Sequence, residues 1–169
     1  MIALQKNLNA LIVLTISGIL LGAFGVQFFL HEQPCPLCLL QRSMMIGVAA
    51  SALLNIHFGI KPAHYALGLL CSLTGGVVAL RHIALHVCPG FPTFGLPVLG
   101  LSLYTWSFLI FTCCVLAIAL LLLMYNPYEE DRKPSATGLG QLASLMIFIV
   151  VVGNIFATLN QCGLTACAE

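Results

Sequence analysis

Two cysteines separated by two residues dominate the chemistry that this sequence can perform. Cys35 and Cys38 stand in the segment His-Glu-Gln-Pro-Cys-Pro-Leu-Cys-Leu-Leu-Gln-Arg, which covers residues 31–42. Cysteines at this spacing can close a small disulfide ring, and Pro36 restricts the loop and favours an extended backbone at the residue before it. We therefore expect a preorganised pair that exchanges readily between dithiol and disulfide.

Arg42 follows Cys38 by about one helical turn. If a helix begins near Cys38, the partial positive charge of its first turn favours a thiolate there, and Arg42 lies on the same face. The sequence thus predicts Cys38 as the activated sulfur. An arginine at the bilayer surface is costly without an anionic partner, which a thiolate would supply. The alternative is that Arg42 is an anchor at the helix end, reaching toward the lipid headgroups.

The same cysteines could instead form half of a structural zinc site. Such sites normally need four ligands, so His31, His82 or His86 would have to complete the set with Cys35 and Cys38. We expect redox chemistry instead, because the proline-rich spacing and the neighbouring arginine suit thiol exchange better than a closed tetrahedral site.

The chain has eight cysteines, and the other six divide by position. Cys71, Cys113 and Cys114 fall within long apolar runs, where an apolar medium suppresses the thiolate, so they are predicted to be packing residues. The remaining three lie outside those runs: Cys88, Cys162 and Cys167.

The elements that must position these residues are membrane helices. Hydrophobic residues make up 60% of the 169 residues and charged residues 7%, with a mean hydropathy of +1.07. A soluble globule of this composition would have an apolar surface, so lipid is the expected solvent. Apolar runs long enough to cross a bilayer predict five spans, at residues 10–30, 43–58, 65–80, 101–125 and 139–159. A net charge of +1 leaves no basic stripe, which excludes nucleic-acid binding.

Basic residues set the predicted orientation of this single membrane domain. Four lie on one side of a five-span chain and two on the other: Lys6, Lys61, Arg132 and Lys133 against Arg42 and Arg81. The positive-inside rule therefore predicts a cytoplasmic N-terminus. The outer face then holds the loops 31–42 and 84–103 and, because the number of spans is odd, the tail 160–169.

Several of these residues together resemble one known family. Gln27, then Pro-Cys-Pro-Leu-Cys at 34–38, then Gln41-Arg42 are similar to the end of the first transmembrane helix in the disulfide bond formation protein B (DsbB) family. Arg81-His82, followed by an outer loop, is similar to the end of the family's third helix.

The resemblance implies an all-α integral membrane protein with a DsbB-like four-helix bundle, to which this chain adds a fifth transmembrane helix. It implies a bound ubiquinone or menaquinone near the Cys-x-x-Cys, and a periplasmic DsbA-like thioredoxin-fold oxidant as partner. On that match Arg42, His82 and Gln27 would approach the quinone, and Cys38 would form the charge-transfer contact with it.

The loop between the third and fourth spans departs from the family pattern. Family members carry a second cysteine pair there, which meets DsbA, whereas the loop 84–103 of this chain holds only Cys88. A single thiol cannot store two electrons as a disulfide. The tail offers Cys162 and Cys167, so we expect it to replace the missing pair.

Two connectivities remain open for the tail. Cys162 and Cys167 can be bonded to each other, or one of them can be bonded to Cys88. Chain entropy favours the local ring because a short loop costs less to close. The alternative for the local pair is a staple that only ties down the tail.

The sequence therefore predicts a bacterial inner-membrane thiol:quinone oxidoreductase that reoxidises a DsbA-like dithiol, with Cys35, Cys38, Cys88, Cys162 and Cys167 as its redox cysteines. The alternatives are a vitamin K epoxide reductase-like protein, a reductive thiol conduit, and a metal-binding or metal-transporting membrane protein that uses outer cysteines and histidines.

Overall fold

The computed structural model describes residues 2–29, 35–87, 98–127 and 138–162. Within those ranges the chain forms five long helices, listed here in chain order: α1 (Ile2–Phe29), α2 (Pro36–Phe58), α3 (Pro62–Val87), α4 (Leu103–Leu123) and α5 (Gly138–Cys162). All five are long and apolar enough to cross a membrane. The prediction of an all-α membrane protein with five spans is confirmed.

Each of the first three helices extends beyond the apolar run that predicts it. α1 begins at Ile2 rather than near residue 10 because polar side chains in its first turns are buried against other helices. The Asn9 amide, for example, donates to the Tyr65 hydroxyl at 2.9 Å, and the Gln5 amide donates to the Leu121 carbonyl at 3.5 Å. Hydrogen bonds between helices thus stabilise the first turns of α1, where the sequence is not apolar.

α2 also begins earlier than the sequence predicts, at Pro36 instead of near residue 43. Pro36 is at the first helical position, where its missing N–H and fixed φ are tolerated, and Cys35 is the N-cap. Arg42 consequently lies within the helix and not in an outer loop. α3 likewise continues to Val87, so the start of the predicted outer loop 84–103 is helical.

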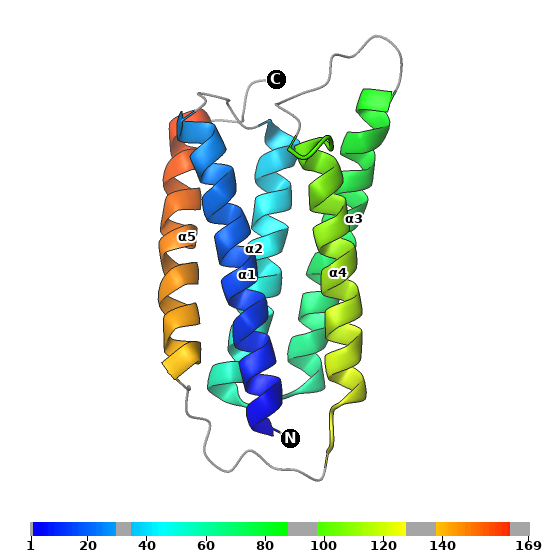
Figure 1. Ribbon diagram of the computed structural model, residues 1–169, viewed down its shortest axis with the longest axis vertical. Helices are drawn as coiled ribbons and strands as arrows, with labels where there is room; N and C mark the ends of the chain where they lie inside the picture. The colour runs from blue at the N-terminus through cyan, green and yellow to red at the C-terminus, as the bar shows by residue number, and fades with distance from the viewer. Residues whose placement is uncertain (1, 30–34, 88–97, 128–137, 163–169) are drawn as a thin grey trace.

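The helices run alternately up and down, and α2 is central to the bundle (Figure 1). It packs against α1, α3 and α5, and α3 packs in turn against α4. α5 lies along the side of α1, away from α4, and ends at the same end of the bundle at which α1 ends and α2 begins (Figure 1).

Glycines allow the central helices to approach closely, as small residues commonly do in membrane bundles. A Cβ on Gly47 of α2 would lie 2.7 Å from the Cys71 sulfur of α3. A Cβ on Gly75 of α3 would overlap the Phe111 ring of α4, which is only 1% exposed. These contacts fix the spacing of α3 between α2 and α4.

The three cysteines predicted to be packing residues behave differently from one another. Cys71 and Cys114 belong to the packed interior, but Cys113 is exposed on the outer surface of α4. The packing prediction is therefore wrong for Cys113, because adjacent positions on a helix face different sides.

Candidate redox site

The first turn of α2 brings the Cys35 and Cys38 sulfurs to 2.7 Å from each other. Cys35 has an extended backbone, with φ −71° and ψ 161°, and its carbonyl accepts the Cys38 N–H at 2.9 Å. The same N–H lies 3.2 Å from the Cys35 sulfur. The helix start therefore holds two free thiols side by side, so a disulfide can form without rearrangement of the helix.

His82 of α3 joins this pair from the neighbouring helix. Its Nε2 lies 3.8 Å from the Cys35 sulfur, its Nδ1 lies 3.3 Å from the Gln41 amide nitrogen, and the side chain is 2% exposed. An amide nitrogen can only donate, so His82 Nδ1 accepts that hydrogen bond. The imidazole proton is then on Nε2, from which it is donated to the Cys35 sulfur.

The hydrogen bonds that Cys35 accepts lower the pKa of its thiol to about 4, far below the ordinary value. The Cys38 thiol is the largest contributor; partial burial opposes the shift, and His82 and the Cys38 backbone N–H add to it. In the reduced pair the thiolate is therefore at Cys35, and the prediction that Cys38 is the activated sulfur is corrected. The reason is that Cys35 accepts hydrogen bonds from the Cys38 thiol, from His82 and from the Cys38 backbone N–H.

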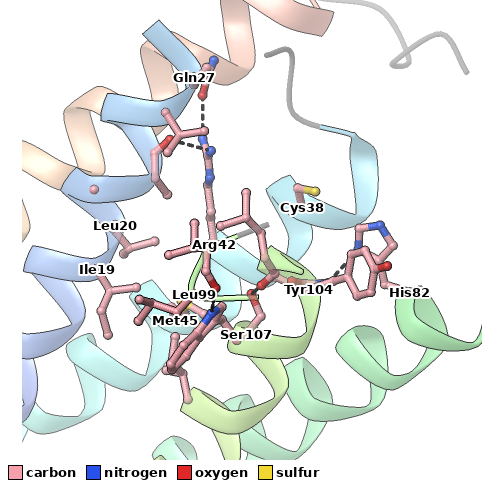
Figure 2. Close-up of a pocket in the computed structure, with 18 residues that line it drawn as sticks. Ile19, Leu20, Gln27, Cys38, Arg42, Met45, His82, Leu99, Tyr104 and Ser107 are labelled. Atoms are coloured by element: carbon pink, nitrogen blue, oxygen red, sulfur yellow. Dashed lines mark hydrogen bonds between the residues drawn. The ribbon is translucent and has the colours of Figure 1, made fainter. Parts of the chain in front are cut away.

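Arg42 of α2 points toward α1, where neutral groups accept its hydrogen bonds. Its guanidinium donates to Gln27 Oε1 at 2.7 Å and to the Ala23 carbonyl at 3.3 Å, and it lies 5.1 Å from the centre of the Phe24 ring. Figure 2 shows the side chain extended between α2 and α1 with both hydrogen bonds. These partners orient the guanidinium without cancelling its charge.

A cavity of about 480 Å³ lies beside these residues. Its walls come from α1, α2 and α4, with His82 of α3 and the turn at 98–99, and most of the lining is apolar. Cys38, Arg42 and Gln27 supply polar groups, whereas Cys35 is not among the lining residues. Cys38 therefore lines the cavity, as Figure 2 shows, whereas Cys35 does not.

Tyr104, in the first turn of α4, completes the polar end of the cavity. Its ring centre lies 4.8 Å from that of His82 and 5.1 Å from that of His86. The turn before α4 is held in place by the Trp106 indole, which donates to the Val98 carbonyl at 2.9 Å. The first two turns of α4 thus form part of the cavity wall.

The structure brings together five of the residues that the sequence nominates: Cys35, Cys38, Arg42, His82 and Gln27. Cys88, Cys167 and the side chain of Cys162 lie outside the described residues. Sequence reasoning missed Gln41 and Tyr104. Gln41 was visible beside Arg42, but its contact with His82 depends on how α2 and α3 pack, and Tyr104 depends on the α3–α4 packing.

A possible metal set is contained in the same cluster. The ligand atoms of Cys35, Cys38 and His82 all lie within 4.8 Å of one another. Of the other histidines that the zinc alternative names, His86 has its Nδ1 2.9 Å from the His82 carbonyl oxygen, and His31 lies outside the described residues.

Fold and site together define a multi-pass helical membrane protein with a dithiol at the edge of an apolar cavity. Residues 5–93 match the family described as Disulfide bond formation protein DsbB. The chain is 30% identical to Disulfide bond formation protein B 2 of Burkholderia lata, over 57% of this chain and 76% of that protein. It is 34% identical to Disulfide bond formation protein B of Alkalilimnicola ehrlichii, over 63% of this chain and 68% of that protein.

A third relative, Disulfide bond formation protein B 1 of Pseudomonas fluorescens, is 27% identical over 59% of this chain and 79% of its own length. No solved structure matches the chain. On the family match and these relatives, the chain belongs to the DsbB family, the membrane proteins of disulfide bond formation.

Proposed function

We propose that this protein is a thiol:quinone oxidoreductase of the bacterial inner membrane. It reoxidises a periplasmic DsbA-like dithiol oxidant and passes the electrons to ubiquinone or menaquinone. The observation that carries the proposal is the division of the cysteine pair: Cys35 lies at the helix end beside His82, while Cys38 lines an apolar cavity between the helices, next to Arg42.

The cavity has the chemistry that a quinone requires. Its apolar walls suit a ring with an isoprenoid chain, and Arg42 and Tyr104 are among the few polar side chains in its lining that can donate a hydrogen bond. When bound, the quinone would accept two electrons and two protons. Arg42 would favour negative charge developing at a carbonyl oxygen, because its present partners are neutral.

The division of the pair also assigns separate roles to the two sulfurs. In the disulfide state, an incoming thiolate attacks Cys35, the sulfur at the helix end, and a mixed disulfide forms as the Cys35–Cys38 bond breaks. Cys38 then leaves as the thiolate, facing the cavity and Arg42. The second thiol of the incoming pair then attacks the first, which closes that pair's own disulfide and releases Cys35 as a thiolate, and the His82 Nε2–H stabilises this thiolate. Cys38 is thus the electron-donating sulfur during turnover, although Cys35 is the thiolate of the resting dithiol.

The tail supplies the link to the partner. α5 ends with Cys162 at the end of the bundle at which α2 begins (Figure 1). Its last turn therefore includes Cys162, three residues beyond the predicted end of the span. We assign the pair Cys162–Cys167 as the shuttle between partner and Cys35, with a bond from Cys88 to one of them as the other connectivity.

Membranes containing the full chain test the proposed activity. Reduced thioredoxin-fold oxidant is added, and its reoxidation is followed with and without added quinone. We expect quinone-dependent turnover that Cys35→Ser or Cys38→Ser abolishes and that Cys113→Ser, on the outer surface of α4, leaves intact. Turnover that needs no quinone, or that survives Cys38→Ser, contradicts the proposal.

Variants of Arg42 test whether its charge binds the quinone and whether its hydrogen bonds to α1 hold it in position. Arg42→Met should raise the KM for quinone at least about tenfold, as expected for losing a charge-assisted contact. Arg42→Lys should recover only part of this loss, since an ammonium group cannot reproduce the two-pronged contact with Gln27 and the Ala23 carbonyl. An unchanged KM in Arg42→Met would remove Arg42 from the quinone site.

The tail is tested by alkylation and mass mapping of the outer cysteines in membranes. If Cys162 and Cys167 are joined in the wild type and accumulate as thiols in Cys38→Ser, they relay electrons. If they remain oxidised in that variant while Cys88 changes state, the tail pair is a staple and the shuttle assignment is wrong.

A further inference from the structure

The cluster of Cys35, Cys38 and His82 has nearly the dimensions of a metal site. Four ligands around zinc, with bonds of about 2.3 Å to sulfur and 2.0 Å to nitrogen, stand roughly 3.5–3.8 Å apart. The Cys35 sulfur and His82 Nε2 are already 3.8 Å apart. The two sulfurs, at 2.7 Å, would have to separate by about 1 Å, which side-chain rotation provides.

The surroundings support ligation as well as redox exchange. The Cys38 N–H points at the Cys35 sulfur at 3.2 Å, where it offsets the negative charge of a bound thiolate. Gln41 meets the other imidazole nitrogen of His82 at 3.3 Å. A metal on Nε2 requires the proton on Nδ1, and a half-turn of the Gln41 amide presents its oxygen to accept that proton. The Gln41 amide can therefore donate to His82 in one tautomer and accept from it in the other. Hydrogen bonds of this kind commonly orient histidines that bind a metal.

We propose that the reduced Cys35–Cys38 pair, with His82, binds a soft or borderline cation such as Zn²⁺ and that this binding blocks electron transfer. No electrons move on binding: Cys35 and Cys38 coordinate as thiolates, His82 contributes a lone pair, and the displaced thiol proton passes to solvent. The fourth position belongs to water or another small ligand, because His86 is turned toward the His82 carbonyl. The site is therefore open and reversible, unlike a closed structural site.

Oxidation and metal binding exclude each other at this site. A disulfide removes two of the three ligands, so only the dithiol form can be captured, and a bound cation holds both sulfurs away from exchange. The inhibition rests on the proposed function, whereas the binding does not. Among the described residues, Cys35, Cys38 and His82 are the one group of three or more metal-ligating side chains that comes together.

Zinc competition with a chromophoric chelator tests the binding, on the full chain with Cys88, Cys162 and Cys167 changed to Ser. We expect about one Zn²⁺ for each reduced chain and none after the Cys35–Cys38 disulfide is formed in the same preparation. Equal zinc binding before and after oxidation overturns the site. This comparison needs no further mutation, so it does not depend on how a variant folds.

Variants in the same background then test the ligand set. Gln41→Leu should weaken zinc binding about 10–100-fold as the loss of an outer partner, and His82→Ala should weaken it further. Cys113→Ser is the matched control and should bind as the parent does. Full affinity in a folded His82→Ala protein, judged by its thermal unfolding, excludes the three-ligand site.

Inhibition is measured on the same chain with Cys88, Cys162 and Cys167 changed to Ser, prereduced and mixed with a soluble quinone, at zinc concentrations that half-saturate and saturate the dithiol. We expect the rate to fall in step with occupancy and to recover when EDTA is added. An unchanged rate at saturating zinc overturns the inhibitory role. A protein that binds zinc in the chelator assay but never reduces quinone refutes the proposed function and leaves the metal site standing.

Discussion

Two adjacent glycines on α3 give a matched test of how the site is held together. Gly75 is buried, and a Cβ there would lie 2.7 Å from Phe111 Cε2 and closer still to Cζ and Cε1. A Cβ on Gly76 would lie 3.9 Å from the nearest Phe111 atom, an ordinary contact. We expect Gly75→Ala to disrupt the α3–α4 interface and Gly76→Ala to be tolerated.

The magnitude follows from the packing of Phe111. Overpacking a filled interior costs about 1–3 kcal/mol, and the upper end applies because the ring is 1% exposed and three of its atoms would overlap the new Cβ. Gly76→Ala should instead gain about 0.5–1 kcal/mol from reduced backbone entropy. The two variants should therefore differ by about 4 kcal/mol, or roughly 8–16 °C in Tm for a chain of this size.

Gly75→Ala should also disturb the redox site, because it changes the packing of α3 against α4. His82 is two turns beyond Gly75 on α3, and Tyr104 is two turns before Phe111 on α4, so both contacts belong to one helix interface. Thermal unfolding in detergent, followed by circular dichroism, measures the stability difference. Adding Phe111→Leu to Gly75→Ala should restore much of the loss. Equal Tm values for Gly75→Ala and Gly76→Ala would refute the packing argument.

Two further predictions concern the cysteine pair and the fifth helix. Since the pKa of Cys35 is about 4, its alkylation rate in the reduced protein should be flat above about pH 5 and fall below it. Cys38→Ala removes the largest cause of the low pKa, so the thiolate should then form only at higher pH, and alkylation at about pH 6 should slow at least tenfold; superimposable pH profiles would contradict this. On α5, a Cβ at Gly153 would lie 3.4 Å from the Phe24 ring, against which Arg42 packs. Gly153→Ala should leave quinone reduction unchanged, whereas Gly153→Leu should displace the ring and lower the rate about tenfold; equal rates in the two variants would show that α5 does not support Arg42.

The five helices and the central residues of the site can be predicted because each depends on a short stretch of sequence. Five apolar runs of bilayer length predict five spans, and Cys35, Cys38 and Arg42 lie within one short motif. The role of His82 came from the family resemblance, since a lone histidine near a helix end carries little information by itself.

What the sequence could not predict depends on contacts between helices. The apolar runs place the starts of α1 and α2 too late in the chain, because polar residues such as Asn9 find partners on other helices, and Pro36 begins a helix before its apolar run. The sequence also favours a thiolate at Cys38, because it does not show that Cys35 accepts hydrogen bonds from the Cys38 thiol and from His82 of α3. The contact between Gln41 and His82 appears only once α2 and α3 are packed.

The most direct test of the proposed function is a single turnover of the prereduced protein, with Cys88, Cys162 and Cys167 changed to Ser, mixed with a soluble quinone and without any thiol partner. The account predicts that two electrons pass to the quinone for each chain and that mass mapping then finds a Cys35–Cys38 disulfide. Cys38→Ser should transfer none. If the quinone stays oxidised while both cysteines remain thiols, or if it is reduced as fast by Cys38→Ser, the assignment of this pair as the quinone-reducing centre is wrong.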